Sequence, residues 1–163
     1  DIILAKSIPI PPEETGGSLH DKLADLAADV LTETLELLKN DTAPRIPQEP
    51  ALVSYIPKLD REHGRIDWTM PAAALERRIR AYDPWPGTYT EAIENGSPKR
   101  LKIHPPTAVV ETSLPPGEVR IEANRLIVGC GTHSLELFQV QPDGGKPMSA
   151  ADYLRGRKPE RFK

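Results

Sequence analysis

The apolar positions of this chain change their spacing near residue 87, and the change predicts two kinds of structure. Before it, apolar residues recur at helical spacing over about 18–39 and again over about 69–82. After it, apolar and polar residues alternate over short stretches bounded by turn residues, which is typical of strands. The pattern therefore predicts an α+β fold, in which helices precede a small antiparallel β-barrel.

The first long apolar stripe predicts an amphipathic helix. Ser18 is a good N-cap residue, and Asp21 is expected in the first turn, near the positive end of the helix dipole. The stripe consists of Leu19, Leu23, Leu26, Val30 and Leu37 or Leu38. An apolar run rich in isoleucine and interrupted by prolines over residues 2–10 predicts an edge strand before this helix. The helix needs a sheet or another helix to cover its stripe.

A proline-rich stretch separates the two helical patterns. Residues 40–58 contain four prolines and no clear period, so they are predicted to form an extended linker. The second helix is predicted to begin near Thr69, with Pro71 in its first turn, and to end at the loop 83–87. Its buried face is predicted to comprise Ala72, Leu75, Ile79 and Tyr82.

The period-two region predicts six strands and a final short helix. The strands are expected at 88–94, 99–104, 107–112, 117–122, 125–130 and 134–140. Asn95-Gly96 is a strong hairpin signal between the first two. The helix is expected to run from about Ser149 to Leu154, with Gly156 just past its end.

Composition narrows the class of protein. The chain has 163 residues, 38% of them hydrophobic, which is enough for a core. No run approaches 18 consecutive apolar residues, so no membrane-spanning helix is expected. The single cysteine, Cys130, excludes a disulfide framework and fits a reducing compartment. Because Asp1 opens the chain with neither an initiator methionine nor a signal segment, we expect a piece of a longer protein.

Charge is divided unevenly. Residues 1–57 carry a net charge of −6 and residues 58–163 a net charge of +3, which suggests two modules with different partners. Arginines on a rigid element suit phosphate contacts, because the planar guanidinium engages two oxygens. The candidate phosphate-binding residues are Lys58, Arg61, Arg65, Arg77, Arg78, Arg80, Lys102 and Lys146. The alternative is a solvated face whose arginines have local partners such as Glu76 or Asp83.

Other candidate chemistry is weak. Ser18, His20 and Asp21 supply the residue types of a hydrolase triad, but they lie within one helical turn and no nucleophile elbow surrounds the serine. No partner at metal-ligand spacing is available to the histidines His63, His104 and His133 or to Cys130, so no metal is expected. The residues themselves therefore leave two interpretations of this small module, polyanion binding by its basic side chains or a solvated basic face.

Several blocks together resemble the C-terminal half of the methionyl-tRNA formyltransferase family. These blocks, which keep their order across nearly the whole chain, are Thr15-Gly16-Gly17-Ser18-Leu19-His20-Asp21-Lys22-Leu23-Ala24, Tyr55-Ile56-Pro57-Lys58-Leu59, Gly64-Arg65-Ile66-Asp67-Trp68, Arg77-Arg78-Ile79-Arg80-Ala81 with Asp83-Pro84-Trp85-Pro86-Gly87, and Gln141-Pro142 with Lys146-Pro147-Met148-Ser149-Ala150. The resemblance implies that residues 1–39 are the tail of a Rossmann-like catalytic domain, 40–58 a linker, and 59–163 an OB-like barrel domain.

The resemblance also implies a function. Members of the family transfer a formyl group from 10-formyltetrahydrofolate to the amino group of methionyl initiator tRNA, in the cytoplasm and without a metal. The catalytic residues of the family are expected upstream of Asp1, so this segment would bind and orient tRNA and be inactive alone. The parent enzyme is expected to be monomeric. The segment is expected to dimerise or be disordered through its uncovered residues 1–39.

Two other functions stay open. The barrel is alternatively a module for protein contacts or domain packing, with tRNA held elsewhere. The parent is alternatively a related formyltransferase that acts on a sugar nucleotide. Arg77, Arg78, Trp85 and Pro86 favour the tRNA enzyme, because the relatives that act on sugar nucleotides usually lack the double-arginine helix leading into this loop.

Overall fold

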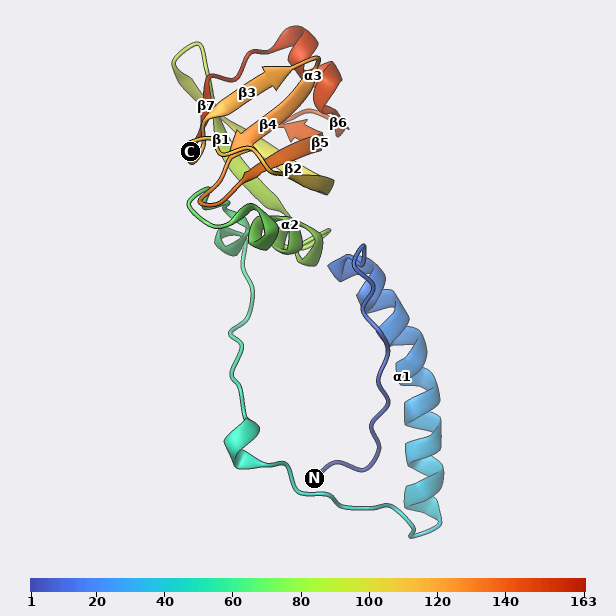
Figure 1. Ribbon diagram of the computed structural model, residues 1–163. Helices are drawn as coiled ribbons and strands as arrows, with labels where there is room; N and C mark the ends of the chain where they lie inside the picture. Colours follow the sequence, from blue (N-terminus) through green and yellow to red (C-terminus); the bar gives the residue numbers. More distant parts are fainter. The chain divides into compact units, whose positions relative to one another are not determined.

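The computed structural model describes residues 1–163, which divide into two units, Asp1–Lys58 and Leu59–Lys163. The first unit contains α1 (Gly16–Lys39) and a single 3₁₀ turn, η1 (Pro50–Leu52). The second unit carries the sheet and the other two helices. Figure 1 shows this order from blue to red.

Helix α1 begins earlier than predicted. Its N-cap is Thr15, whose hydroxyl accepts a hydrogen bond from the Ser18 N–H at 3.2 Å, while the Thr15 N–H donates to Ser18 Oγ at 3.1 Å. In this capping box Ser18 is the third helical residue, so its assignment as the N-cap was wrong, and Asp21 lies beyond the first turn. Beside this end lies the buried Glu14, where hydrogen bonds from Lys22 and then Ser18 lower the pKa of the carboxyl.

The predicted edge strand at residues 2–10 does not form. Only Ile2 makes a β-bridge, to Ile46, with N–O distances of 2.7 and 3.0 Å. The chain offers these residues no further partner strand, and the prolines that end the segment have no N–H to donate. The stripe of α1 also stays uncovered within this unit, since none of its residues is buried and Leu23 is 47% exposed.

The second unit is a nearly closed antiparallel barrel with two helices. Its elements are η2 (Glu62–Gly64), α2 (Ala72–Ala81), β1 (Thr88–Glu94), β2 (Ser97–Val110), β3 (Val119–Glu122), β4 (Arg125–Gly129), β5 (Ser134–Pro142), β6 (Met148–Ser149), α3 (Ala150–Gly156) and β7 (Arg161–Phe162). The sheet order is β3-β4-β5-β2-β1-β7, and β6 pairs with β5. A bridge between Glu118 and Arg161 joins the two ends of the sheet. The predicted α+β fold with a small antiparallel barrel is confirmed.

Local predictions within the barrel are confirmed in most places. Strands β1, β4 and β5 lie where the alternation placed them. Asn95 and Gly96 both have positive φ, 51° and 74°, as the tight hairpin turn between β1 and β2 requires. Ser149 caps α3 by accepting the Asp152 N–H at 3.0 Å.

Three local predictions need correction. The strands expected at 99–104 and 107–112 are one strand, β2, with an irregular register between His104 and Thr107, where two prolines interrupt the ladder of hydrogen bonds. Helix α2 begins at Ala72, after Pro71 as N-cap, rather than near Thr69. The short strands β6 and β7 were not predicted.

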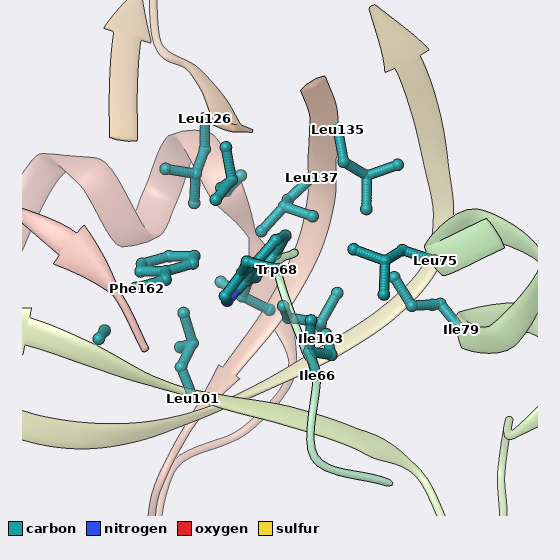
Figure 2. Packing of buried hydrophobic residues seen from close by; sticks show 14 of the residues in the cluster. Ile66, Trp68, Leu75, Ile79, Leu101, Ile103, Leu126, Leu135, Leu137 and Phe162 are labelled. Carbon is teal, nitrogen blue, oxygen red and sulfur yellow. The ribbon is translucent and has the colours of Figure 1, made fainter. Parts of the chain in front are cut away.

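The core lies inside the barrel and under α2 (Figure 2). Trp68 and Phe162 pack with their ring centroids 5.7 Å apart, and both are buried. The indole N–H of Trp68 donates to Thr90 Oγ1 at 2.9 Å, and the Thr90 hydroxyl donates to the Lys163 carbonyl at 2.8 Å, so the buried polar atoms are satisfied. Burial raises the pKa of Cys130 to about 12, which keeps this thiol neutral and is consistent with packing rather than reactivity.

Candidate nucleic-acid interface

The outward face of β2 carries a row of basic side chains. Leu101 and Ile103 are buried in the barrel, so the alternate residues Arg100, Lys102 and His104 point away from it. Arg100 and Lys102 are exposed, and His104 is half-buried. The strand period thus places two permanent cations and an imidazole on one surface of the sheet.

A small pocket opens beside this row. Its volume is about 110 Å³, and it lies between the loop 83–87 and the side chains of Tyr89, Arg100, Lys102 and His104. The imidazole of His104 lies between Asp83 of this loop and Gln141 of β5. Its Nδ1 lies 3.8 Å from Asp83 Oδ1, and its Nε2 lies 3.2 Å from Gln141 Oε1.

The guanidinium of Arg100 packs over the ring of Tyr89. The guanidinium carbon lies 3.7 Å from the centre of the tyrosine ring, and the tyrosine hydroxyl donates to Glu62 Oε2 at 3.0 Å. Burial and the hydrogen bond to Glu62 raise the pKa of Tyr89, so the phenol stays protonated. Glu91, the cross-strand neighbour of Arg100, lies 3.9 Å from Arg65 instead. Arg100 therefore carries its charge without an ion pair.

The loop that walls the pocket is fixed by a close backbone contact. A Cβ on Gly64 would lie 2.0 Å from the carbonyl oxygen of Gly87, so only glycine fits there. The Gly87 N–H donates to the Tyr82 carbonyl at 2.8 Å, and the Ile66 N–H donates to the Tyr89 carbonyl at 2.9 Å. Two of the blocks noted in the sequence, 64–68 and 83–87, thus pack against each other at the edge of β1.

The structure brings some of the sequence-predicted residues to this surface. Arg65 lies beside Tyr89 through a parallel bridge, and Lys102 is the cross-strand partner of Tyr89. Lys146 is exposed on the loop after β5, which is tied to β2 by a hydrogen bond of 3.2 Å from the Asp143 N–H to the Arg100 carbonyl. Lys102 therefore lies on β2, Arg65 lies across β1 from it, and Lys146 belongs to a loop that is joined to β2 at Arg100.

The other predicted residues lie elsewhere or have partners of their own. Lys58 belongs to the first unit. Arg61, which directly precedes η2, and Arg77 on α2 are both exposed to solvent. Arg78 donates to the His63 carbonyl at 2.6 Å. Arg80 pairs with Glu76, at 2.5 Å between Nε and Oε1, as the alternative of local partners anticipated.

Two residues of this surface were missed from the sequence. Arg100 lies two positions before Lys102 in a predicted strand, so the period of two was a sufficient signal for it. Tyr89 had a weaker signal, because the Asn95-Gly96 turn sets the register that places it diagonally opposite Arg100 but does not specify that the guanidinium stacks on the ring. A basic and aromatic surface on a small barrel can bind the phosphates and bases of a nucleic acid.

The two neighbouring arginines of α2 are expected to differ in their contribution to stability. Replacing Arg78 by alanine should lower the free energy of unfolding by about 1.5–3 kcal/mol, because the buried side of its guanidinium donates to the His63 carbonyl. Replacing the exposed Arg77 by alanine should change it by less than about 0.5 kcal/mol. Urea unfolding followed by tryptophan fluorescence measures both. Equal losses for the two variants would contradict the assigned roles.

Residues 1–163 contain neither a cluster of metal-ligating side chains nor a helix that could span a membrane. No three His, Cys, Asp or Glu side chains are grouped so that they could hold a metal ion. No helix has both the length and the apolar character needed to cross a membrane.

Comparison with known proteins agrees with the fold and identifies relatives. The family described as "Formyl transferase, C-terminal domain" matches residues 58–158. The methionyl-tRNA formyltransferase of Moorella thermoacetica is 41% identical over 158 residues, which cover 96% of this chain and 50% of that protein. The corresponding enzyme of Syntrophus aciditrophicus is 44% identical over 161 residues, covering 97% and 50%. The chain spans about half the length of these relatives.

Solved structures share the fold at lower sequence identity. A variant of HypX from Aquifex aeolicus superposes with a TM-score of 0.63 and 18% identity, over 90% of this chain and 27% of that one. HypX in complex with tetrahydrofolic acid gives a TM-score of 0.55 and 20% identity, over 78% and 22%. The family match extends from residue 58 past the end of α3 and includes the loop 83–87, which walls the pocket, and the block 64–68, which packs on that loop. The chain therefore belongs to the formyl transferase C-terminal domain family.

Proposed function

We propose that this chain is the C-terminal part of a methionyl-tRNA formyltransferase. Support comes from 41–44% identity to enzymes of that name along nearly all of the chain. The enzyme would transfer a formyl group from 10-formyltetrahydrofolate to the amino group of methionine on initiator tRNA. In this reaction the amine attacks the formyl carbon, and a base and oxyanion donors outside the chain would assist it.

In this proposal the barrel binds and orients the tRNA. The observation that carries it is the surface around β2, where Arg100 and Lys102 are exposed without ion pairs and Arg65 and Lys146 lie nearby. Cations on a rigid sheet bind the RNA backbone and set the position of the molecule without reading its sequence. The chain alone would then bind tRNA but not formylate it.

The test is a titration of the chain with initiator tRNA at several salt concentrations. Binding should be substantial at low salt, and the logarithm of the association constant should fall linearly with the logarithm of the salt concentration. Four phosphate contacts would give a slope of about −3. No binding at low salt would overturn the tRNA role and leave the barrel as a domain-packing module.

A further inference from the structure

We propose that the pocket between the loop 83–87 and β2 is a subsite for one phosphate group of the RNA backbone. Arg100 and Lys102 would be its cationic ligands, and Tyr89 would be the residue that positions Arg100. The choice of RNA as the source of the phosphate rests on the proposed function. The pocket and its charges are independent of that choice.

The residues that line the pocket carry more positive than negative charge, because Arg100 and Lys102 outnumber the one lining carboxylate, Asp83. Arg100 and Lys102 are exposed and have no ion pair, although three carboxylates lie nearby. Each of these faces another group: Glu91 faces Arg65 at 3.9 Å, Glu62 accepts the Tyr89 hydroxyl at 3.0 Å, and Asp83 faces His104 at 3.8 Å. An anion between the two cations would form the ion pairs that neither of them makes within the protein.

The geometry of Arg100 suits a phosphate. The tyrosine ring covers one flat face of the guanidinium at 3.7 Å and leaves the N–H groups at its edge available. The ring is itself held through its hydroxyl by Glu62. Because the guanidinium is already oriented, less side-chain entropy is lost when its N–H groups bind two phosphate oxygens.

The size of the pocket limits the ligand. At about 110 Å³ it is smaller than the cavities of about 300–1,000 Å³ that hold whole cofactors or drug-sized ligands. A phosphate group fits such a space, whereas a complete nucleotide sugar or folate does not. The wall opposite the cations is rigid, since Pro84 and Pro86 restrict its backbone and Gly87 packs on Gly64.

The experiment measures tRNA affinity and its salt dependence for five variants of the full chain. Arg100→Gln and Lys102→Gln should each weaken binding about tenfold at low salt, as expected for the loss of a charge-assisted hydrogen bond. Each should also reduce the salt slope by up to about 0.7–0.9, the increment of the one phosphate that the two cations share. Lys158→Gln is the matched control, because Lys158 is an exposed lysine that lies outside the pocket lining, and it should leave both quantities unchanged.

Two tyrosine variants separate positioning from folding. Tyr89→Leu removes the ring beneath Arg100 and should weaken binding as Arg100→Gln does. Tyr89→Phe keeps the ring and should restore most of the affinity, although it loses the hydroxyl. Equal affinity for all the pocket variants and Lys158→Gln, with binding by the unmodified chain intact, would overturn the subsite and leave the proposed function standing.

Two other results, absence of tRNA binding and displacement of tRNA by a small phosphorylated ligand, differ from equal affinity of the variants. If the unmodified chain bound no tRNA, the proposed tRNA-binding role of the barrel would fail, and the assignment of the pocket to the RNA backbone would fail with it. If a free nucleoside diphosphate displaced tRNA from the unmodified chain at concentrations that inorganic phosphate does not match, the pocket would belong to a small phosphorylated ligand, and its assignment to the RNA backbone would be overturned.

Discussion

Replacing Gly117 by alanine is expected to open the barrel where its two ends meet, with a loss of about 3 kcal/mol or more in the free energy of unfolding. Gly117 has a φ of +76°, and a Cβ on it would lie 2.2 Å from the carbonyl oxygen of Phe162. The same residue accepts the Phe162 N–H at 2.7 Å, so a side chain there would displace β7 from the closing contact. Two costs add at this position, the left-handed backbone conformation and the collision.

Gly96→Ala is the matched control for this prediction. Gly96 has nearly the same φ, +74°, but a Cβ on it would meet nothing within 4 Å. Only the cost of the left-handed conformation applies there, about 1–2 kcal/mol. Urea unfolding followed by tryptophan fluorescence reports on this unit, because Trp68 and Trp85 both belong to it. An equal loss for both variants would show that the contact between Gly117 and Phe162 does not close the barrel.

Replacing Phe162 by alanine is expected to lower the free energy of unfolding by about 3–5 kcal/mol. The side chain is 1% exposed and packs on Trp68 in the centre of the core (Figure 2). Its removal would leave a cavity between the indole and the strands around it. Since small domains are stable by only about 5–15 kcal/mol, this one substitution would remove a large part of the total.

Phe162→Leu provides the control, because it keeps most of the apolar volume and should cost less than about 1.5 kcal/mol. Hydrogen exchange adds a local measurement. The Phe162 and Lys163 amides donate to Gly117 and Glu91, and they should exchange faster in Phe162→Ala than in Phe162→Leu. Unchanged protection of both amides in the alanine variant would show that β7 is held by its backbone pairing rather than by this side chain.

The candidate interface was predicted from the sequence only in part. The charges of Arg65, Lys102 and Lys146 are visible in the sequence, and the period of two places Lys102 on the outward face of its strand. Charge type does not show which arginines are already paired, so Arg78 and Arg80 looked equivalent to Arg77 until their contacts with His63 and Glu76 were known. The Asn95-Gly96 turn sets the strand register that brings Arg100 near Tyr89, but the stacking of the guanidinium on the ring depends on side-chain conformations that the register does not specify.

Local chemistry accounts for the parts of the fold that were predicted well. Helix α2, the turn at Asn95-Gly96 and strands β1, β4 and β5 follow from periodicity and turn residues within a few positions of each other. Strand β7 has two residues, too few for any period, and forms because Phe162 gains burial beside residues distant in the sequence. Residues 2–10 have a strand-like composition yet stay irregular, because a strand requires a partner and only Ile46 provides one. Pairing and burial between distant segments thus decided the closure of the barrel and the shape of its pocket, because their free energy depends on neighbours that a short stretch of sequence does not contain.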